Sequence, residues 1–323
     1  MSLSPIGLST YSRLQHLKQT IEALKSNALA KKSDLYVFSD AAKPGDEEKV
    51  AKVRKYLDTI SGFKNIHVFK RTQNSRVRNN RDGISDILNK YGKCIYLEED
   101  IVTAPGFLTF MNASLDVYEK EEKIFCISGY SPPINIPAGY RSDTFILRRA
   151  CAWGMGIWHD RFKRISYLDK AEVLSRFSNN MEIEELSKYG EDLLRMILLD
   201  ADGKMDALDV KIFYHQFLNE KYTVYPRKSL VKNIGHDGSG IHCVQTNKFD
   251  VELWDKLAFE IDDKVDLDDR IVQSNYRFRE IGGGAKANKN FKSYFKTHLK
   301  LLIPIKKLKK FLTGIFIKVL KSS

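Results

Sequence analysis

Residues 93 to 100 form a short apolar run that ends in three consecutive carboxylates: Lys93-Cys94-Ile95-Tyr96-Leu97-Glu98-Glu99-Asp100. Similar runs precede it, each bounded by polar or turn residues, at residues 5–10, 34–39 and 65–69. Between the runs, apolar residues recur at helical spacing in residues 14–24, 50–60 and 84–91. Run centres about thirty residues apart match the length of one strand followed by one helix. The sequence therefore predicts an α/β fold with a mostly parallel sheet and helices on both faces.

Three local signals predict where helices begin and end. Ser12, with Gln15 three residues later, forms a capping-box pattern and predicts the start of the first helix. Gly92 predicts the end of the third helix, since glycine readily adopts the left-handed conformation found at helix C-termini. Thr103 and Pro105 predict the start of a fourth helix shortly after the carboxylates.

The carboxylates Glu98, Glu99 and Asp100 follow the fourth strand, at the edge where parallel sheets bind their ligands. Three adjacent negative charges repel one another, and such clusters gather at functional sites. We expect a hard divalent cation, Mg²⁺ or Mn²⁺, because it accepts carboxylate oxygens and is completed by waters and substrate phosphates. The alternative is that the acids only cap a helix or lie in solvent, although Thr103 and Pro105 already supply a helix start.

The positive charge of the chain is concentrated at its C-terminal end. The 323 residues carry a net charge of +12, and residues 286–323 hold eleven lysines and no acidic residue. The preceding residues carry 42 basic and 41 acidic side chains and are nearly neutral. A basic appendage of this kind is typical of a tail that binds an anionic surface.

Within that tail, the apolar residues form one helical stripe, which consists of Leu301, Ile305, Leu308, Leu312, Ile315 and Val319. No charge-free run approaches the roughly twenty residues of a spanning helix, so we expect an amphipathic helix that lies in a membrane interface. The N-terminus lacks a secretion-signal pattern and the four cysteines form no CxxC pair, which predicts a cytoplasmic protein, peripheral on the inner face of the cell membrane. A helix packed on the body or on a partner subunit is the alternative.

Five stretches resemble the GT-A glycosyltransferases, specifically bacterial relatives of the N-acetylglucosaminyltransferase that initiates complex N-glycan branching. They occur in the family order and comprise residues 5–17, 96–110, 126–133, 153–158 and 225–243. The resemblance implies a GT-A domain over residues 1–243, which leaves an extension over residues 244–285 before the Lys-rich tail of residues 286–323. It also implies an inverting transfer, by one direct displacement, from a nucleotide-sugar donor that we expect to be a UDP-sugar.

The resemblance assigns roles to individual residues. The last acid of the family's metal motif holds the metal, so Asp100 inherits that role, and His242 is a candidate contact to the metal or the diphosphate. Donor binding is expected of Thr10, Arg13, Asp40, Glu98, Glu99, Trp153 and Gly154. Four candidates have a structural alternative: Asp40 forms a turn, Arg13 lies in solvent, and Trp153 and His242 serve packing. Glu99 stands where the family usually has aspartate.

A displacement on an acceptor hydroxyl also needs a group that removes its proton. The segment Gly203-Lys204-Met205-Asp206 resembles the family segment that carries this base, so Asp206 is the expected base. Asp209, three residues further on, is the alternative base. In a third interpretation, Asp206 only caps the helix that follows it.

Two other functions match parts of the sequence. A sugar nucleotidyltransferase shares the layered fold and the acidic metal site, but it needs a glycine-rich basic loop after the first strand, which this sequence lacks. A noncatalytic nucleic-acid-binding protein would use the lysine tail, but the body is neutral and carries no recognition motif. We therefore expect a metal-dependent hexosyltransferase that acts on a saccharide or lipid-linked saccharide acceptor in cell-surface polysaccharide synthesis, without a nucleic-acid partner.

Overall fold

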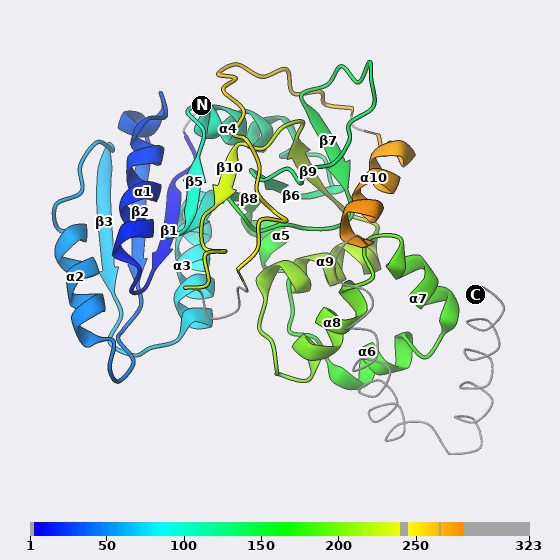
Figure 1. Ribbon diagram of the computed structural model, residues 1–323, viewed down its shortest axis with the longest axis horizontal. Coiled ribbons are helices and arrows are strands. Elements are labelled where there is room, and N and C mark those ends of the chain that lie inside the picture. The colour runs from blue at the N-terminus through cyan, green and yellow to red at the C-terminus, as the bar shows by residue number, and fades with distance from the viewer. Residues whose placement is uncertain (1–2, 240–244, 265, 281–323) are drawn as a thin grey trace. The chain divides into compact units, whose positions relative to one another are not determined.

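The computed structural model describes residues 3–239, 245–264 and 266–280 (Figure 1). The chain divides into two compact units. Among the described residues, the first comprises those of 1–166 and 212–274, and the second comprises Tyr167–Lys211 and residues 275–280. The expected boundaries at residues 243 and 285 stay predictions, and the tail of residues 286–323 lies outside the described residues.

The first unit is built on an eight-stranded sheet with the strand order β3-β2-β1-β4-β8-β6-β9-β7. Its strands are β1 (Ile6–Thr10), β2 (Asp34–Ser39), β3 (Asn65–Lys70), β4 (Lys93–Glu98), β6 (Ile124–Ser128), β7 (Thr144–Leu147), β8 (Met155–Trp158) and β9 (Tyr222–Pro226). The pairs β1–β2, β2–β3, β1–β4 and β6–β9 are parallel, whereas β7 and β8 run against their neighbours. The mostly parallel sheet and its first four strands are confirmed.

The helices that lie wholly in this unit are α1 (Leu14–Lys25), α2 (Glu47–Leu57), α3 (Arg76–Tyr91), α4 (Phe107–Val117), α5 (His159–Phe162) and the 3-10 helix η1 (Ala30–Lys32). Helix α9 (Leu208–Asn219) begins in the second unit and ends in the first. Helix α10 (Asp269–Glu280) begins in the first unit and ends in the second. The first three helices occupy the segments that the sequence predicts.

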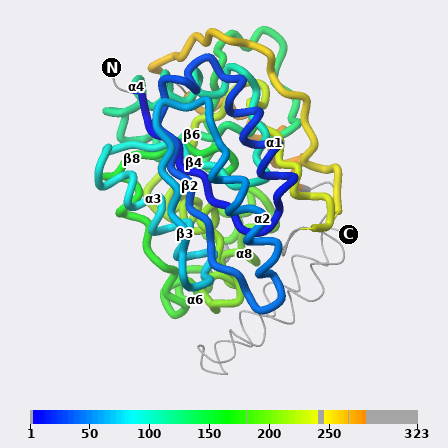
Figure 2. The backbone as a smooth tube through the Cα atoms, turned by 90° about the vertical axis from the view of Figure 1, so that its left-hand side faces the viewer, coloured from blue at the N-terminus to red at the C-terminus, as the bar shows by residue number. Residues whose placement is uncertain are grey.

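Helices cover both faces of the sheet, as expected. Ile6 and Leu8 of β1 belong to the same cluster of buried residues as Leu17 of α1. Gly7 between them faces the other way, because side chains alternate along a strand, and a Cβ there would lie 2.9 Å from Cδ1 of Ile87 in α3. Figure 2 shows α1 and α2 on one side of β2 and β3, and α3 on the other.

Of the three helix boundaries predicted from local signals, one is confirmed and two are wrong. Gly92 ends α3 with a φ of 77°, and its N–H donates to the carbonyl oxygen of Leu88 at 2.8 Å. Helix α1 begins after Arg13 rather than Ser12, without a side-chain capping bond. Thr103 belongs to a strand rather than to a helix cap, and α4 begins at Phe107, after Gly106.

A second, two-stranded sheet explains why Thr103 does not start a helix. Strands β5 (Ile101–Thr103) and β10 (Val231–Asn233) pair antiparallel, with Asn233 opposite Ile101. Their pairing continues through the N–H of Ile234, which donates to the carbonyl oxygen of Asp100 at 2.9 Å. This small sheet therefore brings a segment from more than a hundred residues away in the sequence next to the acids.

The second unit contains α6 (Lys170–Arg176), α7 (Asn180–Ser187), α8 (Leu193–Ala201) and the first turn of α9. Helix α8 contacts both α6 and α7, and Asp169 caps α6 by accepting from the N–H of Glu172 at 2.8 Å. None of the helices in the described parts of either unit combines the length and the apolar character that crossing a bilayer requires.

Candidate functional site

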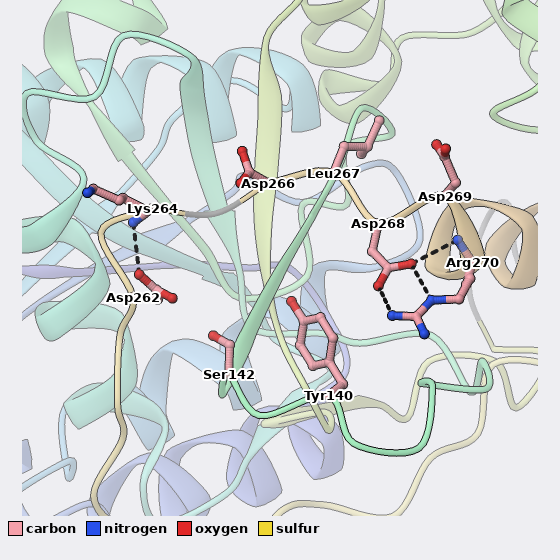
Figure 3. A pocket seen from close by; sticks show the side chains of 9 residues that line it. All are labelled: Tyr140, Ser142, Asp262, Lys264, Asp266, Leu267, Asp268, Asp269 and Arg270. Carbon is pink, nitrogen blue, oxygen red and sulfur yellow. Dashed lines mark hydrogen bonds and ion pairs between the residues drawn. The ribbon is translucent and has the colours of Figure 1, made fainter.

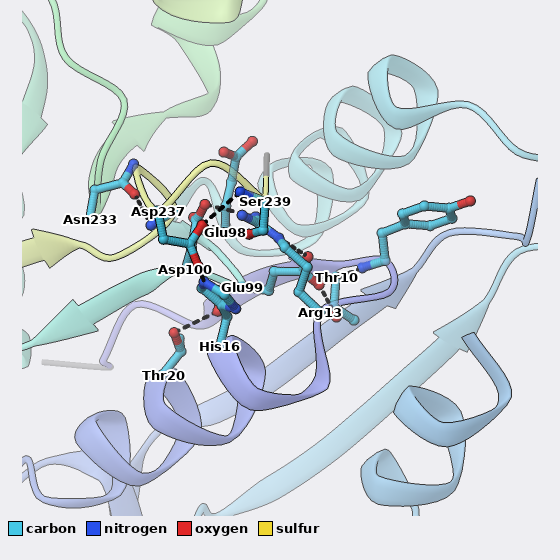
Figure 4. A network of polar contacts seen from close by, with 12 residues as sticks. Thr10, Arg13, His16, Thr20, Glu98, Glu99, Asp100, Asn233, Asp237 and Ser239 are labelled. Carbon is cyan, nitrogen blue, oxygen red and sulfur yellow. Dashed lines mark hydrogen bonds and ion pairs between the residues drawn. The ribbon is translucent and has the colours of Figure 1, made fainter. Parts of the chain in front are cut away.

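The carboxyl ends of β1 and β4 lie side by side and carry polar residues that the sequence analysis selected. The two strands pair in parallel, with Ser9 opposite Glu98. The turn after β1, which carries Thr10 and Arg13, therefore meets the acids after β4 at one edge of the sheet (Figure 4). Parallel sheets bind their ligands at this edge.

Glu99 ties these two strand ends together. Its Oε2 accepts hydrogen bonds from the Thr10 hydroxyl and the Tyr11 N–H, both at 2.6 Å. Its Oε1 accepts from Nε of Arg13 at 2.8 Å, and its carbonyl oxygen accepts from the Thr20 hydroxyl at 2.8 Å. Glu99 is buried, and both of its carboxylate oxygens hold the turn after β1 in place. Its predicted contact with the donor stays a prediction.

Asp100 has one carboxylate oxygen paired and the other open. Oδ2 accepts from Nη2 of Arg13 at 2.7 Å. Oδ1 is buried and has no hydrogen-bond partner among the described residues. A buried acceptor without a partner is costly, and a hard divalent cation supplies the interaction that it lacks. Asp100 therefore fits the role of metal ligand that the sequence analysis assigns to it.

The rest of a metal site would have to come from outside the protein. No three His, Cys, Asp or Glu side chains within residues 3–239, 245–264 and 266–280 are grouped so that they could hold a metal ion together. A cation bound to one protein carboxylate keeps several waters and takes further oxygens from substrate phosphates. His242, the other predicted metal contact, lies outside the described residues.

Arg13 supplies a positive charge to these acids that the sequence analysis did not foresee. Its guanidinium contacts Glu99 through Nε and Asp100 through Nη2. Burial alone lowers the pKa of Arg13, but the charges of Asp100 and Glu99 outweigh burial and raise it above its ordinary value. Arg13 is therefore a permanent cation, and the repulsion that we expected to need a metal is already reduced within the protein.

The three consecutive acids do not form one cluster. Side chains alternate along β4, so Glu98 lies on the same face of the sheet as Tyr96. This is the face toward which Gly7 of β1 points, since a Cβ on Gly7 would lie 3.0 Å from the Tyr96 ring. There Oε1 of Glu98 accepts from Nδ2 of Asn80 in α3 at 2.9 Å. Glu98 thus contacts the α3 side, while Glu99 and Asp100 share Arg13.

Residues 233–239, here called the strap, cover Asp100 and Arg13. Oδ1 of Asn233 accepts from the N–H of Gly235 at 2.7 Å. A Cβ on Gly235 would lie 2.1 Å from Oδ2 of Asp100 and 2.9 Å from Nη1 of Arg13. Only glycine therefore allows the strap backbone to lie this close to the two charged groups.

The strap is also fastened to α1. Oδ2 of Asp237 lies 3.1 Å from Nε2 of His16, a residue of α1. Oδ1 of Asp237 accepts from the hydroxyl and the N–H of Ser239, and these bonds lower the pKa of Asp237 to about 2. Asp237 therefore carries its negative charge at neutral pH and offers it to His16.

Asp40 joins the loop after β2 to the start of α3. Its Oδ1 accepts from the N–H groups of Ala41 and Ser75 at 2.9 and 3.0 Å, and Oδ2 accepts from Nδ2 of Asn74 at 3.1 Å. The residue is buried and orders the loop around it. Its predicted contact with the nucleotide stays a prediction.

Trp153 lies in an aromatic group that includes a residue of the strap. Its ring packs edge-on against Tyr130, His236 and Phe249, with centroids 4.6 to 5.9 Å apart. The next residue, Gly154, has a φ of 62°, and a Cβ there would press into Phe107 at 2.9 Å. Packing thus accounts for the glycine, while a sugar contact by either residue stays a prediction.

The two candidate bases lie in the second unit. Oδ1 of Asp206 accepts from Nζ of Lys211 at 2.7 Å, and Oδ1 of Asp209 accepts from the N–H of Val210 at 3.0 Å. Lys211 is buried and also donates to Oδ2 of Asp200 at 2.8 Å. Asp206 is therefore one of two carboxylates that share a lysine.

A cavity of about 510 Å³ lies elsewhere in the first unit. Figure 3 shows its lining, in which Asp262 accepts from the N–H of Lys264 and Asp268 is paired with Arg270. None of the residues at the ends of β1 and β4 lines it. The cavity is therefore separate from the candidate site.

By sequence, no protein family and no curated protein matches the chain. By structure, it is similar to TarS of S. aureus, with a TM-score of 0.43, 11% identity and coverage of 73% of this chain and 37% of that chain. A mannosyltransferase from Pyrobaculum calidifontis, in complex with GDP-Man and Mn²⁺, gives a TM-score of 0.29 at 12% identity over 39% of this chain and 34% of its own. A cytidylyltransferase from Leptospira borgpetersenii gives 0.30 at 10% identity over 51% of this chain and 63% of its own.

Sequence reasoning missed several residues of this site, among them His16, Thr20, Asn233 and Gly235. His16 and Thr20 belong to an ordinary amphipathic helix, where nothing distinguishes them from solvated polar positions. Asn233 and Gly235 lie in a stretch that carries the family resemblance, and their turn-forming residue types were the available signal.

Proposed function

We propose that this chain is a metal-dependent, inverting glycosyltransferase that moves a sugar from a nucleotide-sugar donor, a UDP-sugar, to a saccharide acceptor in cell-surface polysaccharide synthesis. One observation carries the proposal. At the ligand-binding edge of the sheet, Asp100 combines a buried, unpartnered carboxylate oxygen with a neighbouring arginine. A carboxylate for a cation and a guanidinium for phosphate oxygens are the two groups that a diphosphate leaving group needs.

A divalent cation, when bound, would supply Lewis-acid stabilisation of the negative charge on the departing diphosphate. Asp100, whose buried Oδ1 has no partner among the described residues, would be the protein group that holds it. Glu99 fixes the turn after β1 and so holds Arg13 at the edge of the sheet where the phosphates would bind. Both acids are buried, and a charge interaction is stronger in such surroundings than in bulk water.

The acceptor hydroxyl attacks the anomeric carbon as the bond to the diphosphate breaks, and inversion follows from that single displacement. Its proton passes to a carboxylate, for which Asp206 remains our first choice and Asp209 the alternative. The side chain of Asp206 is 37% exposed, so part of it is accessible from solvent.

A panel of sugar nucleotides tests the proposed function. The protein is incubated with each one in the presence of Mn²⁺ or of a chelator, and the release of nucleoside diphosphate is measured. We expect release with one UDP-sugar, and only with the cation. A matched reaction with nucleoside triphosphates and sugar 1-phosphates tests a nucleotidyltransferase, and release of pyrophosphate there would refute the proposal.

We further propose that the tail of residues 286–323 binds the anionic inner face of the cell membrane, where lipid-linked acceptors would lie. Its eleven lysines each contribute roughly 1 kcal/mol near such a surface. Truncation before Lys286 should release the protein from anionic liposomes at low salt, while transfer to a soluble acceptor is retained. Equal liposome binding by the truncated and full-length proteins would contradict the anchor and favour a protein contact.

A further inference from the structure

Arg13 has a different environment from the two acids that it joins. Its side chain is 23% exposed, against 6% for Glu99 and 7% for Asp100. Nε contacts Glu99, Nη2 contacts Asp100, and Nη1 lies beneath the strap at Gly235. The guanidinium is thus the most accessible charged group of the three, and its Nε and Nη2, rather than Nη1, contact the two carboxylates.

We propose that Arg13 is a built-in counter-ion of Asp100 that gives way when a divalent cation binds and then turns to the donor diphosphate. This inference rests on the proposed function and assigns Arg13 a positioning role within it. In the cation-free protein, the guanidinium neutralises Oδ2 of Asp100. When a cation binds Oδ1, it repels the guanidinium and at the same time satisfies the carboxylate.

In this proposal the guanidinium moves within the site and stays attached to Glu99. The Nε contact to Glu99 acts as a pivot, because it holds the guanidinium at the turn after β1 when Nη2 leaves Asp100. The two nitrogens of the guanidinium edge can then form the paired hydrogen bonds that arginine makes with phosphate oxygens. The hydrogen bonds that Arg13 forms with the diphosphate thereby offset the attraction to Asp100 that it loses.

The proposal predicts that one substitution has effects of opposite sign on two ligands. Arg13→Gln removes the charge that competes with the cation, so Mn²⁺ alone should bind at least about tenfold more tightly, the size of effect that a unit charge has at this range. The same variant lacks the phosphate contact, so at saturating Mn²⁺ it should bind UDP at least about tenfold more weakly. A residue that served only the fold would not move the two affinities in opposite directions.

Two binding measurements test it. Free Mn²⁺ is counted by electron paramagnetic resonance as the protein is titrated without nucleotide, and UDP binding is then followed by calorimetry at saturating Mn²⁺. The matched control is Arg164→Gln, which removes a half-exposed arginine of the same unit and should change neither affinity. Unchanged or weaker Mn²⁺ binding by Arg13→Gln would overturn the proposal.

A second variant keeps the test decisive if Arg13→Gln does not fold. Arg13→Lys retains the charge but not the paired geometry, so Mn²⁺ affinity should stay within about threefold of the wild type while UDP affinity falls. Undiminished UDP affinity in Arg13→Lys would count against the proposal. Failure of the wild type to bind UDP with Mn²⁺ would instead refute the proposed function on which it rests, whereas failure of the variants alone refutes only the role of Arg13.

Discussion

Two pairs of carboxylates in this molecule are each joined by a single cationic side chain. The pairs differ in whether the cation or a carboxylate is the more exposed group. In the first unit, Arg13 joins Glu99 and Asp100, which are both buried. In the second unit, Lys211 is itself buried, at 3% exposure, and joins buried Asp200 to half-exposed Asp206. In the first pair the cation is thus more exposed than the acids, and in the second pair one acid is more exposed than the cation.

This difference suggests different chemistry at the two pairs. A buried carboxylate with one unpartnered oxygen is suited to hold a cation, since the interaction then replaces a missing hydrogen bond. A carboxylate that reaches solvent while a lysine holds it at one oxygen is suited to meet a substrate hydroxyl. Arginine at the first pair offers a planar fork for phosphate, whereas lysine at the second is a point charge.

The largest expected difference between the two pairs of carboxylates is in the rate of sugar transfer. Asp206→Asn should lower transfer by roughly 10² to 10⁴, because a carboxamide cannot take the acceptor proton, while donor binding stays close to the wild type. Steady-state transfer and calorimetric donor binding measure the two quantities. If Asp209→Asn is the inactive variant and Asp206→Asn is active, the base has been misassigned.

A smaller effect separates the two partners of Lys211. Asp200→Asn should lower the free energy of unfolding by about 3 kcal/mol, because it leaves a buried lysine with one carboxylate fewer. Asp206→Asn should cost less than about 1 kcal/mol, because its carboxylate is partly in solvent. Urea denaturation of both variants measures the difference. Equal losses of unfolding free energy would show that the two carboxylates stabilise the fold equally.

The order of strands and helices at the start of the chain could be predicted because long apolar runs carry a clear period. Strands β1 to β4 and helices α1 to α3 occupy their expected segments. The capping box at Ser12 was wrong because the turn instead directs Arg13 toward acids some 86 residues away, a contact that no local pattern records. The helix start at Thr103 was wrong because a three-residue strand pairs there, and so short a strand has no readable period.

The candidate site was predictable in part for the same reason. The acids and the turn after β1 could be placed at the same edge of the sheet, because parallel strands end on one side, whereas the pairing of β1 with β4 was not predicted. The position of the strap over Asp100 could not be predicted, because it depends on the pairing of β5 with β10. That pairing joins residues from distant parts of the sequence through main-chain hydrogen bonds, which side-chain patterns do not specify.

The smallest expected effect concerns the strap, which covers the first pair of acids. His16→Ala removes the contact to Asp237 and should speed hydrogen exchange at the N–H of Ile234 by roughly two- to fivefold, the range for a partly exposed polar contact. Mass spectrometry of the exchanged protein measures this, with the amides of β2 as an internal reference. Unchanged exchange at Ile234 would mean that the strap is held by its own backbone contacts.

The central claim is that Asp100 holds the cation on which sugar transfer depends, and its most direct test is the release of nucleoside diphosphate from a UDP-sugar by Asp100→Asn. The substitution keeps the shape of the side chain but removes the charge that retains the cation, so activity with Mn²⁺ should fall by about 10³ or more. Asp58→Asn, at an exposed position in the same unit, is the matched control and should leave the rate unchanged. Full, chelator-sensitive activity in Asp100→Asn would contradict the account.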